Sequence, residues 1–300
     1  MDRDGYRMAE MLKAKIKKAL DWNKTKEAHR EGKLLKKRLK YPFYAQIKYD
    51  GNYTVTEVTD DGGIRHTTSG GLDYTSLDDA SAIFAGVEAG FYLAERIYGE
   101  GKLGDRDKCN LKGPKTAQTS INHSYKVFDY LTPYEYKMGY SVRTYKARLH
   151  QVKENIDVGS VAQETMVFDE SDLEFYLDEA SEEGYEGLMC IQEDYKWKDS
   201  TSRTVDIVKY KKRPTADLIC IGVKNGKGKY DNEVGSLLLE DSHGRSVNVG
   251  SGLSDTQRST PASLFIGTVW EIEYERTTAT SYIQPTIVRI RDDKTAEELD

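Results

Sequence analysis

The chain has 300 residues, which suits two domains or one large one with an ample core. No apolar run is long enough to span a bilayer and the N-terminus has no signal-peptide pattern, so we expect a cytoplasmic protein without a membrane segment. The three cysteines, Cys109, Cys190 and Cys220, are odd in number and lack C-x-x-C spacing, which indicates reduced thiols and argues against a zinc site.

The charge is unevenly distributed along the chain. The formal net charge is −6, but residues 1–48 carry 15 Lys and Arg against 6 Asp and Glu, a local charge of +9 that leaves −15 for the remainder. Segregation of this kind suits a protein that touches a phosphate backbone along part of its surface.

The basic N-terminal arm, residues 1–40, is predicted to be helical. Apolar residues recur every fourth position from Tyr6 to Leu20, which is typical of an amphipathic helix, and a second, strongly basic helix is expected over Thr25–Leu39. The arm is interpreted either as a nucleic-acid contact or as a solvated helical surface.

The next part of the chain alternates irregularly between strands and helices, which predicts an α+β domain rather than a doubly wound sheet. Ser171 and Glu174 form a capping-box pattern for a helix ending near Gly184. Turns are expected at Asp50-Gly51 and Asp61-Gly62-Gly63, and a polar loop is expected through Ser120. The other predicted helices are Asp78–Ala89 and Thr144–Asn155. The predicted strands are Tyr41–Val58, Gly90–Tyr98, Tyr125–Leu131, Gly187–Gln192 and Thr204–Tyr210.

Pro214 is the best domain boundary. About five strands with almost no helix follow it, which suggests a small β-barrel. These predicted strands are Asp217–Val223, Val234–Glu240, Val247–Val249, Thr268–Arg276 and Ile283–Ile290. The glycine-rich run Gly222–Lys229 lacks the spacing of a phosphate-binding loop and is interpreted as a turn.

The most informative motif is Lys48-Tyr49-Asp50-Gly51, where a lysine at the end of a β-type run precedes a tight turn. A free lysine has a pKa near ~10.4, so a nucleophilic role needs a decrease of roughly three units, which desolvation or nearby cations can supply. Taken alone, the motif occurs often by chance and favours an ordinary hairpin with an exposed lysine.

Further signatures follow Lys48 in a fixed order. Glu95 ends an apolar strand, Phe128 and Asp129 lie on a buried strand, and Glu186 enters another strand. Lys209 and Lys211 project together because alternate strand residues point the same way. Arg291-Asp292-Asp293-Lys294 is a mixed-charge cluster near the C-terminus. Each signature also has a plainer interpretation. Phe128 would be a core aromatic, and Glu95 and Glu186 would be rim carboxylates. The two lysines would belong to a solvated strand face, and the C-terminal cluster would be a charged tail.

From Tyr44 to Lys294 this ordered set resembles the ATP-dependent DNA ligases of the compact kind encoded by phages, which are covalent nucleotidyltransferases. The stretch Val247–Asp255 and the pairing of Pro285 with Arg289–Lys294 also look like the family's barrel domain. The resemblance implies a nucleotidyltransferase domain over residues 1–213, including the basic arm, and an OB-fold domain over 214–300.

The resemblance also implies a chemistry for the charged residues. Lys48 would attack the α-phosphate of ATP and form a lysyl-AMP intermediate, with Lys209 and Lys211 against that phosphate. Glu186 would hold Mg²⁺, which prefers hard oxygen ligands, and Asp50 would be a second acid beside the site. The AMP would then cap a 5′-phosphate, which a neighbouring 3′-hydroxyl attacks to seal the nick.

The same resemblance implies the nucleotide contacts. Phe128 would stack on adenine, Gln46 would contact the base with Ile47 beside it, and Glu95 would meet the ribose. Arg291 and Lys294 would grip the β- and γ-phosphates. The implied partner is nicked duplex DNA, encircled by a monomer, in replication and repair; RNA/DNA hybrids remain open.

Two positions depart from the family pattern. Tyr53 stands where an arginine usually follows the Asp-Gly turn, and the run His66–Gly71 lacks an arginine near Thr68, although Arg65 lies slightly upstream. These departures put nick geometry and sugar selectivity in doubt. The alternatives that remain are an RNA or hybrid ligase, a GTP-using capping enzyme, and an inactive nucleic-acid-binding module; the missing four-cysteine zinc module argues against an NAD-dependent ligase.

Overall fold

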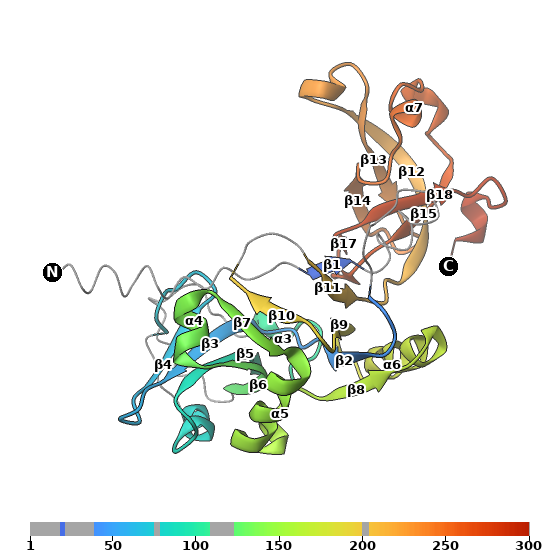
Figure 1. The fold of residues 1–300 in the computed structure, drawn as a ribbon. Coiled ribbons are helices and arrows are strands. Elements are labelled where there is room, and N and C mark those ends of the chain that lie inside the picture. Colours follow the sequence, from blue (N-terminus) through green and yellow to red (C-terminus); the bar gives the residue numbers. More distant parts are fainter. Residues whose placement is uncertain (1–18, 22–38, 75–78, 109–122, 200–203, 300) are drawn as a thin grey trace, which may run out of the picture. The chain divides into compact units, whose positions relative to one another are not determined.

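A computed structural model describes residues 19–21, 39–74, 79–108, 123–199 and 204–299. The chain divides into two compact units, residues 1–212 and 213–300, next to the boundary expected at Pro214. Each unit is described by itself (Figure 1). Within the described ranges, no helix is both long and apolar enough to cross a membrane.

The first unit is built on two main sheets. An antiparallel sheet has the order β4-β3-β5-β6, and a five-stranded sheet has the order β1-β11-β9-β2-β8 in which only β1 runs parallel to its neighbour. The strands are β1 Ala19–Asp21, β2 Phe43–Ile47, β3 Asn52–Val58, β4 Ile64–Thr68, β5 Gly90–Tyr98, β6 His123–Leu131, β8 Glu164–Val167, β9 Leu188–Gln192 and β11 Thr204–Tyr210. A small pair, β7 Tyr140–Thr144 and β10 Lys196–Lys198, completes the unit.

Helices cover these sheets through their apolar faces. Helix α5 (Tyr145–Asn155) packs Val152 against Val127 of β6, and α6 (Glu170–Glu182) packs Leu173 and Leu177 onto the five-stranded sheet. The shorter helices of this unit are η1 Asp79–Phe84, α3 Asp105–Lys108, α4 Pro133–Met138 and η2 Val158–Ser160. Burial of these apolar stripes fixes the sheets on which the candidate site lies.

The second unit is a five-stranded sheet of order β14-β13-β12-β15-β18. Its two outer strands approach each other where Ile287 N donates at 2.9 Å to the O atom of Ser251, two residues after β14. Gly252 is required at this seam, since its φ is 90° and a Cβ would lie 2.2 Å from Ile287 O. The elements are β12 Thr215–Asn225, η3 Gly228–Tyr230, β13 Val234–Glu240, β14 Ser246–Val249, α7 Asp255–Arg258, η4 Ala262–Leu264, β15 Val269–Glu273, β16 Arg276–Thr277, β17 Tyr282–Ile283, β18 Thr286–Ile290 and η5 Ala296–Glu298.

Most predicted strands are confirmed, whereas the helix over Asp78–Ala89 is wrong and the two arm helices are contradicted at their described C-terminal ends. Ala19 and Leu20 belong to β1, because pairing with the edge of β11 outweighs the helical periodicity, and Leu39 is not helical; the rest of the arm lies outside the described residues. The helix expected over Asp78–Ala89 is only η1, since Gly86 at φ 74° ends it.

Three smaller predictions also need correction. The cap of α6 is Asp169, whose Oδ1 accepts from Asp172 N at 3.0 Å, and not Ser171. The strand expected over Thr268–Arg276 is divided between β15 and β16. The one expected over Ile283–Ile290 is interrupted at Gln284 and Pro285, where the backbone turns through a positive φ and loses a donor.

Candidate active site

Lys48 lies at the junction of the two main sheets of the first unit. It follows β2, and its backbone N donates to Gly187 O at 2.8 Å, so it remains tied to the segment entering β9. The turn through Asp50 and Gly51 then leads into β3. Gly51 is needed there because a Cβ would lie 2.4 Å from Arg96 O. The predicted lysine therefore stands on a rigid turn with a side chain 23% exposed.

Glu186 joins two of the predicted lysines. Its Oε2 accepts from Lys48 Nζ and its Oε1 from Lys211 Nζ, and the carboxylate is only 8% exposed. The close approach of the backbone at Gly187 to β11 requires a glycine, because its φ is 137° and a Cβ would lie 2.3 Å from Tyr210 O. We call Lys48, Glu186 and Lys211 the charged face of the site.

A cavity of about 430 Å³ adjoins Lys48, a volume typical of small-molecule sites. It brings together six residues to which the resemblance gives a catalytic or nucleotide-binding role, namely Gln46, Ile47, Lys48, Glu95, Phe128 and Lys209. Its other lining residues are Tyr49, Tyr53, Leu93, Asp129, Tyr145, Ala162, Met189, Ile191, Tyr195, Trp197 and Ile207. The lining is mainly aromatic and aliphatic with a few polar groups, which suits a flat heteroaromatic ligand with a charged end.

Gln46 is the clearest unused polar group of this cavity. The residue is 2% exposed, and its Nε2 has no hydrogen-bond acceptor within the described part of the structure. A buried donor left unsatisfied costs about 1–3 kcal/mol. A ligand that accepts a hydrogen bond at this position would therefore gain affinity.

Glu95 and Lys209 add charged groups at the cavity. Burial raises the pKa of Glu95 to about 7; the Lys48 ammonium opposes this rise and Asp50 adds to it. Lys209 lies in β11, two residues before Lys211. Its ammonium group has no ion pair among the described residues. The cavity therefore offers an available cation beside a carboxyl group that changes charge near neutral pH.

Asp50 is placed differently from the other predicted acids. Its Oδ2 accepts from Gly104 N at 2.8 Å and its Oδ1 lies 3.5 Å from Arg106 Nε, so the carboxylate fastens the segment 101–106 to the turn. It does not line the cavity. A catalytic role for Asp50 stays a prediction, whereas its contacts are those of a positioning residue.

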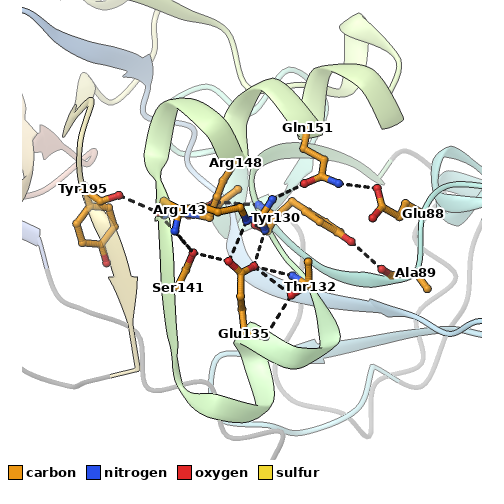
Figure 2. Close-up of polar contacts among 11 residues, drawn as sticks. Glu88, Ala89, Tyr130, Thr132, Glu135, Ser141, Arg143, Arg148, Gln151 and Tyr195 are labelled. Carbon is orange, nitrogen blue, oxygen red and sulfur yellow. Dashed lines mark hydrogen bonds and ion pairs between the residues drawn. The ribbon is translucent and has the colours of Figure 1, made fainter.

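Helix α5 braces the back wall of the cavity, which we define as Phe128 and Asp129 of β6. Tyr145 Oη donates to Phe128 O at 3.0 Å, and the fully buried Arg148 binds Asp129 through Nε at 2.8 Å and Nη2 at 3.1 Å. Arg148 Nη1 also donates to Tyr195 O at 3.2 Å (Figure 2). Both carboxylate oxygens of Asp129 are thereby satisfied by one guanidinium.

A second polar network surrounds this brace. Arg143 binds the Glu135 carboxylate and Gln151, and Gln151 reaches Glu88, as Figure 2 shows. Burial raises the pKa of the Glu135 carboxyl group. The hydrogen bonds from Arg143 and Ser141 outweigh burial and lower this pKa to about 2. Sequence reasoning missed Arg143, Tyr145 and Arg148; the only available signal was an acid next to Phe128, without any indication of its partner.

Tyr53, which replaces the expected arginine, is part of the cavity wall. Its ring centroid lies 5.7 Å from that of Phe128 with the planes inclined by 54°. No arginine is found among the described residues that line the cavity. Arg65, near the second missing arginine, forms a two-bond pair with Asp73, at 2.6 and 3.0 Å.

Arg291 and Lys294 belong to the second unit and are ion-paired there. Arg291 Nη1 lies 2.8 Å and Lys294 Nζ 2.7 Å from Asp217 Oδ2, and Arg291 also binds Asp293. A phosphate would therefore compete with Asp217 for these cations.

A metal held by protein ligands alone is not supported by the described residues, which contain no group of three or more His, Cys, Asp and Glu suited to a metal ion. Mg²⁺ that enters with nucleotide phosphates needs only one or two carboxylates from the protein. Glu186, the predicted Mg²⁺ ligand, does not line the cavity, and both its oxygens accept from lysines.

The first unit has the predicted α+β architecture, and the second is the predicted OB-fold domain. The family model for the DNA ligase OB-like domain matches residues 225–291. The DNA ligases of Enterobacteria phages T6 and T4 are 23% and 22% identical over 332 aligned positions, which cover 87% of this chain and 66% of each relative. The chain therefore spans just under two thirds of the length of these curated relatives.

A solved structure from a study of Lig E DNA ligases has the same fold. It superimposes with a TM-score of 0.66 at 18% identity and covers 92% of this chain and 98% of that one. The resemblance to the DNA ligases that the sequence motifs indicate is confirmed by these comparisons.

Proposed function

We propose that this protein is an ATP-dependent ligase that seals nicks between a 5′-phosphate and a 3′-hydroxyl in duplex DNA through a lysyl-AMP intermediate at Lys48. The observation that carries the proposal is the convergence of Lys48, Glu95, Phe128 and Lys209 on one cavity. The hydrogen bonds that link Lys48 through Glu186 to Lys211 support it further.

In the first step, the neutral amine of Lys48 attacks the α-phosphorus of ATP. The bond from that phosphorus to the β-phosphate oxygen breaks, pyrophosphate leaves with the electron pair, and Nζ loses a proton. Lys209 and Lys211 are cations close to the charge that develops on the phosphate, which is the type of stabilisation that contributes most to phosphoryl transfer. The Glu186 carboxylate pairs with Lys211 as well as with Lys48, so Lys48 is not the only cation that Glu186 binds.

In the later steps, the AMP moves to the nucleic acid. An oxygen of the 5′-phosphate attacks the α-phosphorus of lysyl-AMP, the P–N bond breaks, and Lys48 takes up a proton. The 3′-hydroxyl of the adjoining strand then attacks the 5′-phosphorus, a phosphodiester forms and AMP leaves. Each step exchanges one phosphorus bond for another and needs no oxidant or reductant.

The aromatic part of the cavity is assigned to the adenine base. Phe128 offers a flat ring on a braced strand, and the Nε2 donor of Gln46, which has no acceptor within the described ranges, can donate to a ring nitrogen. Glu95 is assigned to the ribose hydroxyls, since a carboxyl group accepts hydrogen bonds from them in its ionised form. Mg²⁺ entering with ATP, with Glu186 as its protein carboxylate, would neutralise phosphate charge.

The substrate proposed here is a nicked DNA duplex, joined by a monomer in the cytoplasm. The test is the sealing of a labelled nicked duplex by purified protein, with ATP, without ATP, and with a 5′-hydroxyl in place of the 5′-phosphate. We expect joining only with ATP and the 5′-phosphate, with release of one AMP and one pyrophosphate per join. Failure of the protein to join any nick under these conditions would contradict the proposal.

RNA/DNA hybrids are the second substrate class. A tyrosine at position 53 lacks the bidentate grip of a guanidinium, so we expect weaker discrimination at the nick and measurable joining when one strand is RNA. A matched set of nicks that differ only in the sugar on either side tests this. Confinement to all-DNA nicks by more than ~10³-fold, a ratio that corresponds to about 4 kcal/mol in activation free energy, would show that another residue sets sugar selectivity.

A further inference from the structure

The segment 101–106 is fastened to both sides of the charged face. Asp50 N donates to Gly101 O at 2.9 Å, Gly104 N donates to Asp50 Oδ2 at 2.8 Å, and Leu103 N donates to Gly184 O at 2.9 Å. Three hydrogen bonds thus join this segment to the turn that carries Lys48 and to the approach to Glu186. Its conformation is therefore set by the same contacts that set the site.

Arg106 is the side chain that this segment presents at the rim. Its Nε lies 3.5 Å from Asp50 Oδ1, and its side chain is 54% exposed, whereas the Asp50 carboxylate is 7% exposed. A guanidinium has five N–H donors in a planar fork, and the long contact with Asp50 occupies at most one of them. The buried acid holds the charge in place while most donors stay available to a ligand.

The position of Arg106 relates it to the reacting groups without making it part of the cavity wall. Its charge acts on Glu95, which lines the cavity, but Arg106 itself does not line it. Within the cavity the cations are Lys48 and Lys209, which serve the phosphate of the nucleotide. A guanidinium outside the cavity, next to the same carboxylates, suits a different phosphate that arrives from solvent.

We infer that Arg106 binds the 5′-phosphate of the nucleic-acid strand that receives AMP, and that Asp50 positions it for this contact. This inference rests on the proposed function. A bidentate Arg–phosphate contact explains why a rim arginine is held by a buried acid, and it assigns a role to Asp50 that does not require contact with the nucleotide.

The test compares Arg106→Ala and Arg106→Lys with Lys102→Ala in the full-length protein. Lys102 lies in the same segment, is 43% exposed and pairs with Glu100, so it controls for loss of one positive charge. The affinity of each variant is measured for nicked duplexes with a 5′-phosphate and with a 5′-hydroxyl, across a salt series. Adenylylation by ATP, which needs no nucleic acid, is measured in parallel.

For Arg106→Ala we expect the preference for the 5′-phosphate to fall about 10-fold or more and the salt slope to decrease by about one unit. Adenylylation should slow less than about threefold. Arg106→Lys should restore the salt slope but not the full preference, and Lys102→Ala should match the wild type. A melting temperature near that of the wild type shows that each variant is folded.

An unchanged 5′-phosphate preference in both Arg106 variants would overturn the inference. So would a loss of adenylylation as large as the loss of nick binding, because Arg106 would then serve the nucleotide. If the wild type forms no AMP adduct, the proposed function fails, whereas the 5′-phosphate preference and its dependence on Arg106 remain measurable.

Discussion

The two sides of the candidate site are held in place by different means. The charged face consists of side chains that follow strands β2 and β11, joined by one partly buried carboxylate, Glu186. The back wall lies within β6 and is braced from behind by a fully buried ion pair between Arg148 and Asp129. Groups on the charged face can exchange partners when a ligand arrives, while the back wall cannot move without breaking a buried pair.

The two sides should therefore respond differently to substitution, one in reaction rate and the other in the free energy of unfolding. Substitution of the lysines on the charged face should impair reaction with little change in folding, because Lys48 and Lys211 keep contact with water. Substitutions in the brace should destabilise the first unit, because a charge is left without its partner in a low-dielectric interior.

Arg148→Met should lower the free energy of unfolding by about 3–5 kcal/mol, since it leaves the Asp129 carboxylate buried without a counter-charge. Asp129→Asn in the same background should recover part of the loss, because the pair acts as a unit. Denaturant unfolding followed by circular dichroism measures both. A double variant whose loss equals the sum of the losses of the two single variants would show that the pair does not brace the wall.

The brace also shows where prediction from sequence reaches its limit. Local signals sufficed for β5 and β11, whose bounds match the predictions, and for the turn after Lys48, where Asp-Gly determines the geometry. A short motif also indicates Phe128 as a candidate residue of the site. Arg148 and its partner Asp129 are 19 positions apart on different elements, and nothing in the spacing pairs them.

Two further contacts could not be predicted for the same physical reason. The role of Asp50 stays a prediction, but its contact with Gly104 joins residues 54 positions apart. The phosphate contact of Arg291 also stays a prediction, and its pairing with Asp217 joins residues 74 positions apart. Local propensity and motif order are readable in sequence, but the long-range partner that occupies a charged group is not.

Lys209→Ala in the cavity and Lys211→Ala on the charged face should each slow adenylylation by more than ~10²-fold, the loss expected when a transition-state charge is no longer stabilised. Lys212→Ala is the matched control, since Lys212 is 56% exposed and pairs with Asp178. Single-turnover transfer from labelled ATP measures the rates. If either variant reacts within a few-fold of the wild type, that lysine is a surface residue.

Glu95 should make stability depend on pH. Its pKa is raised to about 7 in the folded protein, so the folded state retains a proton that the unfolded state has lost, and stability falls as pH rises from about 4.5 to 7. Relative to Glu95→Gln, the wild type should lose about 2 kcal/mol over this interval, after allowance for partial contact with water. A constant difference between the two proteins across this pH range would show that Glu95 titrates normally.

The cations near the C-terminus provide the smallest expected effect. If Arg291 contacts the β- and γ-phosphates, Arg291→Ala should slow adenylylation by ATP about tenfold, about 1.4 kcal/mol, without slowing the sealing of a pre-adenylylated nick. Asp217→Asn, which removes the competing acid, should not slow it. Arg289→Ala is the control, because Arg289 pairs with Glu271 at an exposed position. Equal slowing by the Arg291 and Asp217 variants would assign the cluster to folding of the second unit alone.

The central claim is that Lys48 becomes covalently linked to AMP, and intact-protein mass spectrometry tests it most directly. The wild type is incubated with ATP and Mg²⁺, and the same measurement is made on Lys48→Ala and on the control Lys212→Ala. We expect one added AMP on the wild type and on the control, mapped to the peptide containing Lys48, and none on Lys48→Ala. An adduct of equal yield on Lys48→Ala, or one mapped to another lysine, would contradict it.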